Sequence, residues 1–124
     1  MAANITETIT LRLSGPGVSA SLTGSTVTAQ VGSNYVQETQ TIATTATALD
    51  IGTAITEGNL GYLSIRNKDT VNTVEFYSDS ALTKKLCTVK PGKAFHFEPA
   101  SGTVAIWGKA LVAPVQIEFL AIET

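Results

Sequence analysis

Apolar residues in this chain recur at every second position, and no longer stretch carries them at the spacing of a helical face. In residues 5–13 the apolar Ile5, Ile9, Leu11 and Leu13 share one parity, whereas the threonines and Arg12 share the other. Side chains of a β-strand point alternately to its two faces, so this pattern is typical of a half-buried strand. The sequence therefore predicts an all-β protein.

Further strands follow at spacings near ten residues, with turn-forming residues between them. We expect them over residues 18–23, 26–31, 35–42, 61–66, 73–77, 85–89, 94–98, 104–107 and 115–122. Short strands at regular spacing favour a sandwich or a barrel.

Turn residues predict how some of these strands connect. Gly15, Pro16 and Gly17 end the first strand, and Gly24 with Ser25 is expected to turn a hairpin whose arms are 18–23 and 26–31. Asn67 to Asn72 supplies Asx-turn residues, and Pro91 with Gly92 fits the middle of a type II turn. Residues 39–56 are rich in Thr and Ala and predict a flexible or extended segment, with a short strand at 48–51 as the alternative.

The length of 124 residues predicts a single domain, residues 1–124. The large side chains are unevenly distributed between its two halves. Strands with small polar side chains bury little, so residues 1–45 are expected to form an extended arm or edge hairpins that reach to a neighbouring chain. Residues 60–124 form the aromatic half, and its large aromatics are expected to meet in one core: Phe76, Phe95, Phe97, Trp107 and Phe119.

Charge and composition exclude several kinds of partner. The chain has a net charge of -2 and only 15% charged residues, which leaves no basic footprint for nucleic acid or an anionic membrane. The N-terminal residues lack the basic and apolar regions of a signal peptide, and no apolar run is long enough to span a bilayer. We expect a soluble protein made in the cytoplasm.

The residue types that carry chemistry are sparse. His96 and Glu98 are expected on one face of a strand, where they could begin a metal site or an acid–base pair, and the turn at Pro91 and Gly92 could place Cys87 opposite His96 as a third ligand or as a nucleophile. A solvent-exposed strand pair and a plain strand thiol are the simpler interpretations, and we favour them. We expect no catalytic, metal or cofactor-binding residues, no cofactor and no small-molecule substrate.

Other charged residues do not gather into a recognisable motif. No spacing singles out a glycosidase pair among the carboxylates Glu75, Asp79, Glu98, Glu118 and Glu123. Lysines are interpreted as solvated edge and turn residues, with docking on an acidic partner as a minor alternative: Lys84, Lys85, Lys90 and Lys93.

Three blocks carry a resemblance to a known class of protein. They are GYLSIRNKDTVNTVEF over 61–76, VKPGKAFHF over 89–97 and VQIEFLAIE over 115–123, with TETITLRLSG over 6–15 of the same character. Together they resemble small virion structural proteins of tailed bacteriophages. The resemblance implies a compact antiparallel β-sandwich of jelly-roll type, with about eight strands, in which Arg66, Asn67, Pro91 and Gly92 occupy the family's turn positions.

The resemblance also implies a function, which the residues alone do not. It implies a non-enzymatic capsid decoration (cement) protein, made in the bacterial host cytoplasm and located in the virion, whose partners are the major capsid protein and copies of itself as a homo-oligomer. A tail, neck or head-fibre subunit is the first alternative. A carbohydrate-binding or adhesin-like sandwich that uses exposed Tyr62, Tyr77 or Trp107 is the second.

Overall fold

The computed structural model describes residues 4–29, 34–51, 55, 59–99 and 105–123. Ten strands and no helix occur among these residues, which confirms the predicted all-β class. The chain forms two compact units, Met1–Ser33 and Asn34–Thr124. Strands Tyr35–Ile42 and Lys85–Val89 have the bounds that the sequence predicted.

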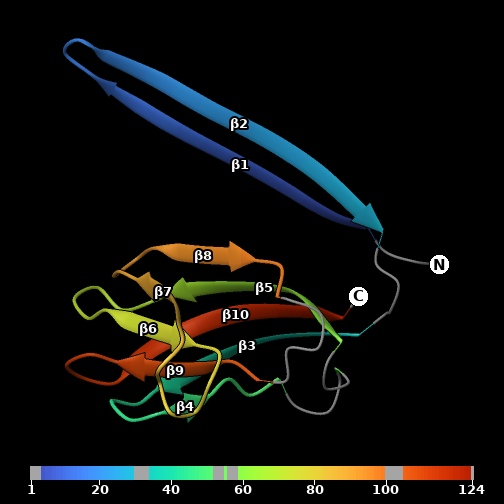
Figure 1. Ribbon diagram of the computed structural model, residues 1–124, viewed down its shortest axis with the longest axis vertical. Coiled ribbons are helices and arrows are strands. Elements are labelled where there is room, and N and C mark those ends of the chain that lie inside the picture. Colours follow the sequence, from blue (N-terminus) through green and yellow to red (C-terminus); the bar gives the residue numbers. More distant parts are fainter. Residues whose placement is uncertain (1–3, 30–33, 52–54, 56–58, 100–104, 124) are drawn as a thin grey trace. The chain divides into compact units, whose positions relative to one another are not determined.

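The first unit contains a two-stranded antiparallel ribbon (Figure 1). Strands β1 (Asn4–Gly15) and β2 (Val18–Ala29) pair over their whole length, and the closing pair Gly15–Val18 leaves a two-residue turn. The proline ring fixes φ of Pro16 close to the value that the first central position of a type II turn requires. The second central position requires a positive φ, and Gly17 has a φ of 76°, so the two residues fit this turn.

The hairpin predicted around Gly24 and Ser25 is wrong. Residues 18–29 form one continuous strand, in which Gly24 lies opposite Ile9 of β1. Glycine alone does not set a turn, whereas the earlier Pro16–Gly17 pair presets both of the backbone conformations that a turn needs. The chain therefore reverses there, and β2 pairs with β1 instead of folding on itself.

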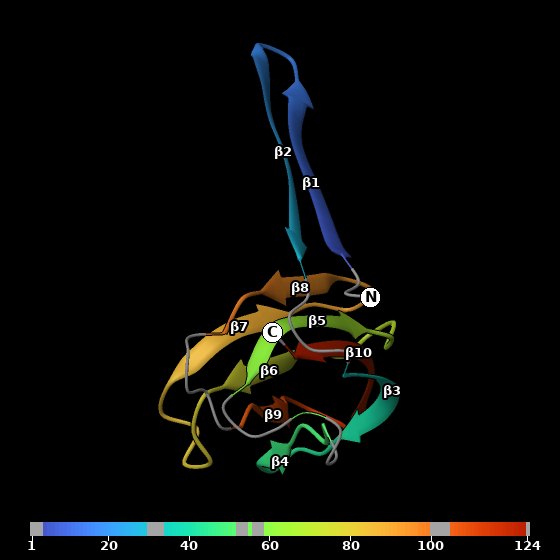
Figure 2. The ribbon, with the colours of Figure 1, turned by 90° about the vertical axis from the view of Figure 1, so that its right-hand side faces the viewer.

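The second unit is a sandwich of two four-stranded antiparallel sheets, drawn as two layers in Figure 2. The first sheet has the order β3-β10-β5-β8 and the second has the order β4-β9-β6-β7. The bounds are β3 Tyr35–Ile42, β4 Thr47–Ala48, β5 Leu60–Asn67, β6 Val74–Tyr77, β7 Lys85–Val89, β8 Ala94–Phe97, β9 Trp107–Ala110 and β10 Val115–Glu123.

This strand order is that of a jelly roll. Numbered within the sandwich, the first sheet joins strands one, eight, three and six, and the second joins two, seven, four and five. Of the connections between consecutive strands, only that between β6 and β7 stays within one sheet, and each of the others crosses to the opposite sheet. Two Greek keys wound in this way confirm the predicted jelly-roll sandwich.

The core lies between the sheets and follows from the alternation of the strands. Buried and less buried residues alternate through β10, so Val115, Ile117, Phe119 and Ala121 all face inward. The sequence predicted that five large aromatic residues meet there, and this holds for only some of them. Phe76 and Phe119 are fully buried, Phe95 and Phe97 pack against the core at its margin, and Trp107 is half-buried and outside the core cluster.

The Thr- and Ala-rich segment contributes to this core, so its interpretation as a flexible segment is wrong for the described residues. Ile42, Leu49 and Ile55 are buried in the cluster, and the backbone N–H of Leu49 donates to the carbonyl of Ile106. A short strand does form, but at Thr47–Ala48 rather than 48–51. A few large side chains, each placed inward, fix a segment whose average composition is polar.

The strand predicted over 104–107 is also misplaced. Val104 lies outside the described residues, and β9 runs over Trp107–Ala110 with Gly108 in its interior. A Cβ atom at Gly108 would lie 3.0 Å from Ile42 Cγ2 and 3.1 Å from Phe76 Cε1. Gly108 is therefore the site of a close approach within the sandwich and not a strand breaker.

Candidate docking surfaces

His96 and Glu98 do not form a site together. His96 lies opposite Ser64 in β8, and its ring packs on Tyr62 with centroids 5.7 Å apart. Strand β8 ends at Phe97, and Glu98 is exposed beyond it. His96 is half-buried, so its ring serves as packing surface at the margin of the first sheet.

Cys87 does not lie opposite His96 across a hairpin, so that prediction is wrong. Cys87 pairs with Phe76 in the second sheet, whereas β8, which carries His96, belongs to the first. The Pro91–Gly92 turn lies in a connection that crosses between sheets, so it does not build a β7–β8 ladder. Burial raises the pKa of the Cys87 thiol to about 12. The group is therefore a neutral thiol at pH 7 and not a nucleophile.

We expect Cys87 to react slowly with iodoacetamide in the folded protein. At pH 8 the fraction of thiolate is about a thousandfold smaller for a pKa of about 12 than for the ordinary value of 9.0. The rate of alkylation, followed by intact mass, should fall by a similar factor relative to the urea-unfolded chain. Equal rates in the two states would contradict the burial of this thiol.

The same thiol gives a pH dependence with a definite sign. Its pKa is higher in the folded chain, so folding favours the neutral form. The contribution to stability is complete below pH 9 and is lost as the pH rises from 9 toward 12. A Cys87→Ala variant should therefore lose less stability than the unchanged chain over that range.

Several carboxylates in the described part of the chain accept hydrogen bonds from nearby groups. Within it, no group of three or more His, Cys, Asp or Glu residues could hold a metal ion. Asp79 accepts hydrogen bonds from the Thr83 hydroxyl at 2.6 Å and from the Lys84 backbone N–H at 2.8 Å. These bonds, that from Thr83 first, lower the pKa of Asp79 and fix the loop between β6 and β7.

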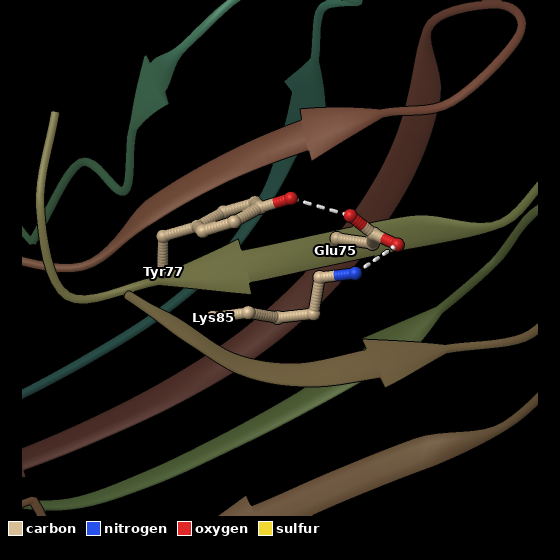
Figure 3. Close-up of polar contacts among 3 residues, drawn as sticks. All are labelled: Glu75, Tyr77 and Lys85. Atoms are coloured by element: carbon tan, nitrogen blue, oxygen red, sulfur yellow. Dashed lines mark hydrogen bonds and ion pairs between the residues drawn. The ribbon is translucent and has the colours of Figure 1, made fainter. Parts of the chain in front are cut away.

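Glu75, Tyr77 and Lys85 form the most concentrated polar cluster of the second sheet (Figure 3). Glu75 Oε1 lies 2.7 Å from Lys85 Nζ, and the Tyr77 hydroxyl donates to Glu75 Oε2. The register shifts between Phe76 and Tyr77, which places Tyr77 opposite Lys85 and brings the ammonium group to the carboxylate.

The charges of this cluster satisfy one another. The Lys85 hydrogen bond and then that of Tyr77 lower the pKa of Glu75, and the carboxylate in turn raises the pKa values of Tyr77 and Lys85. Each group is held in its ordinary state at pH 7, and none is poised to exchange a proton. The cluster fixes the bulge of an edge strand and offers no acid–base chemistry.

A second polar network fixes the loop between β5 and β6. Asn67 is fully buried, and its Nδ2 donates to the carbonyls of Asn72 at 2.9 Å and Val89 at 3.0 Å. Its Oδ1 accepts from the Asp69 backbone N–H at 2.8 Å. The sequence predicted Asx turns here, which these bonds confirm. It did not predict that Asn67 would be buried, because asparagine is usually exposed.

Asp69 completes the loop and ties it to the neighbouring turn. Its Oδ1 accepts from the backbone N–H groups of Val71 and Asn72, each at 2.7 Å, and these bonds, that from Asn72 first, lower its pKa. Its carbonyl accepts from the N–H of Gly92, whose φ is 69°. Pro91 and Gly92 are spanned by a 3.0 Å bond from Lys93 N–H to the Lys90 carbonyl, which confirms the predicted type II turn.

Two loops at this part of the sandwich carry apolar side chains that are exposed to solvent. Val71 is 77% exposed on the loop between β5 and β6, and Val112 is 80% exposed on the loop between β9 and β10. The N–H of Leu111, itself 47% exposed, donates to the carbonyl of Thr73 and joins the two loops, which lie at one end of the sandwich (Figure 1). We call Val71, Leu111 and Val112 the apolar loop end. Exposed apolar side chains on two neighbouring loops are a candidate surface for binding another protein.

The aromatic residues proposed for sugar stacking are not available for it. Tyr62 is 4% exposed and Tyr77 is 7% exposed, while Trp107 is half-buried. A stacking platform requires an open ring face, so the expectation that these three residues are exposed is wrong. Lys84, Lys85, Lys90 and Lys93 are exposed, as the sequence predicted, but Lys85 is paired with Glu75.

Comparisons with protein-family models, curated proteins and solved structures found no match. No helix in the described part of the chain has the length and apolar character that a membrane crossing requires. The apolar loop end was not predicted, although the sequence holds a signal for it. Val71 is an apolar residue within the predicted turn over 67–72, and Leu111 and Val112 are apolar residues between two expected strands.

Proposed function

We propose that this chain is a non-enzymatic structural protein of a virion, and that it decorates an assembled capsid. The observation that carries the proposal is the apolar loop end, where Val71 and Val112 are 77% and 80% exposed on loops fixed by hydrogen bonds. A rigid surface loses little conformational entropy on binding. The sequence resemblance supplies the class of partner, the shell formed by the major capsid protein.

The jelly-roll topology is compatible with this role but does not assign it, because one fold serves many functions. Repetition on a lattice would give many weak contacts a large combined affinity. A protein that binds assembled shell and not free subunits stabilises the shell by mass action. The function therefore needs a docking face and no catalytic group.

The test is sedimentation of the purified chain with shells of the virus that encodes it, freed of their own copies. We expect saturable binding that falls at least tenfold for the double variant Val71→Asp with Val112→Asp. Leu86→Asp is the matched control, since Leu86 is 41% exposed on β7 and lies outside the apolar loop end. The control should bind like the unchanged chain.

Antibody labelling of the virions locates the protein. Label over the head supports decoration, and label confined to the tail or neck would overturn it in favour of a tail, neck or head-fibre subunit. Absence of the chain from purified virions, together with absence of shell binding, would reject the virion assignment.

A further inference from the structure

The ribbon of β1 and β2 has one apolar face and one polar face. Its register places Leu11 directly opposite Leu22, and these side chains are 61% and 66% exposed. Ala20 lies on the same face, one residue pair nearer to the turn, and its side chain is also exposed. Residues at the intervening positions belong to the opposite face and are polar and exposed: Thr8, Thr10, Arg12, Ser19, Ser21 and Thr23.

Charge is nearly absent from the apolar face. Glu7 is the one charged residue at a position on it, and Arg12, which lies between Ile9 and Gly24 in the sequence, belongs to the opposite face. A shallow hollow of about 280 Å³ is lined by Leu11, Ala20 and Leu22, and also by Arg12 and Ser21 at its polar side. Two exposed leucines on a face with little charge are suited to contact with an apolar partner rather than with water.

Gly24 adds a second, independent observation. It lies in the middle of a strand, where glycine weakens the backbone and often marks a close approach by another chain. A Cβ atom built at Gly24 meets nothing within 4 Å, so the chain's own structure does not require glycine there. Gly24 lies two residues after Leu22 and on the same face of the ribbon. The face therefore presents the leucine side chain beside a position that has no side chain.

We infer that the apolar face of the ribbon packs against the same face of another copy of this chain. The face is self-complementary, because a leucine of one copy can enter the gap at Gly24 of the other. From the Ile9–Gly24 pair to the turn, the face also lacks the like charges that would oppose such packing. An isolated two-stranded hairpin is marginally stable in water, and packing of like faces gives it the second layer that it needs.

The area of the face indicates a weak, concentration-dependent association. Twelve residues per strand give the ribbon a length of about 40 Å, and a width of about 10 Å gives a face of about 400 Å². Two such faces bury about 800 Å², and a third ribbon around the same axis adds about 400 Å². These areas are at the low end for protein interfaces, where association is weak and reversible. The inference holds whether or not the chain binds a capsid.

The test is light scattering with size-exclusion chromatography on the full chain, without shells. We expect a mass two or three times the 12.9 kDa of the chain. Leu11→Asp should give a monomer, and Thr10→Asp, which adds the same charge at the neighbouring position on the opposite face, should keep the assembled mass.

Gly24→Val keeps the inference testable even if Leu11→Asp disturbs the ribbon. Valine favours a strand and meets no atom of its own chain, so this variant should keep its far-UV circular dichroism and still lose the assembled mass. Thr23→Val, on the polar face, is the matched control. A monomeric unchanged chain at 100 µM (about a hundredfold above a micromolar Kd) would overturn the inference, and so would an assembled mass that Gly24→Val leaves unchanged. Failure of shell binding alone would affect only the proposed function.

Discussion

Asn67→Ala is expected to lower the free energy of unfolding of the sandwich by about 3 kcal/mol. The substitution removes both donors to the carbonyls of Asn72 and Val89 and the acceptor for the Asp69 N–H. These groups would be left without partners beside a cavity, since Asn67 is fully buried. A buried polar group without a partner costs more than the hydrogen bond itself contributes.

Urea unfolding followed by far-UV circular dichroism measures this loss. Asn72→Ala is the control, because its side chain makes one long contact of 3.4 Å with Asp69 while its carbonyl is kept. We expect the control to lose less than about 1 kcal/mol. Two equal losses would show that general disturbance of the loop, and not the buried amide, accounts for the effect.

Gly108→Val is expected to destabilise the sandwich by about 3 kcal/mol or to prevent its folding. The first added carbon alone would lie 3.0 Å from Ile42 Cγ2 and 3.1 Å from Phe76 Cε1. Both neighbours are fully buried, so they have little room to move. The two further methyl groups of valine would enter the space between the sheets.

The midpoint of urea unfolding checks this prediction. Gly108→Ala should show a smaller loss, because it adds the Cβ alone. Gly24→Val is the matched control, since its Cβ would meet no atom within 4 Å and the ribbon is a separate unit. A stable Gly108→Val protein would mean that Ile42 and Phe76 repack, contrary to the close fit described here.

Strand alternation made the all-β class and several strand bounds predictable, because large β-branched and aromatic residues mark one face clearly. Residues 115–122 are an example, since Val115, Ile117 and Phe119 mark the buried face of β10. The same signal failed in residues 18–31, where small Thr and Ser residues left Gly24 to be interpreted as a turn. The local sequence pattern cannot predict the role of a glycine when that role depends on residues from other parts of the chain that pack against it. Gly108 illustrates this, because Ile42 and Phe76 reach it from distant parts of the chain.

Candidate sites were harder to predict than strands. The Cys87–His96 pair assumed that consecutive strands form a hairpin, but the connection between them crosses from one sheet to the other. Likewise, nothing local indicates that Asn67 is buried, since its partner Val89 lies on β7. Sequence patterns give the residues of a strand and its faces, whereas neighbours across a sandwich follow from the order of strands in the sheets.

That order of strands also has a consequence for how the chain folds. Strand β10 pairs with both β3 and β5, yet it follows every other strand of its sheet in the chain. The sandwich cannot close until β10 emerges during synthesis, and pairings between distant segments form slowly. The ribbon closes through a two-residue turn, and hairpins form in about 1–10 μs. Nascent chains would therefore form and lose the ribbon many times before they have a closed sandwich, and contact between the ribbons of neighbouring copies would stabilise it at that stage.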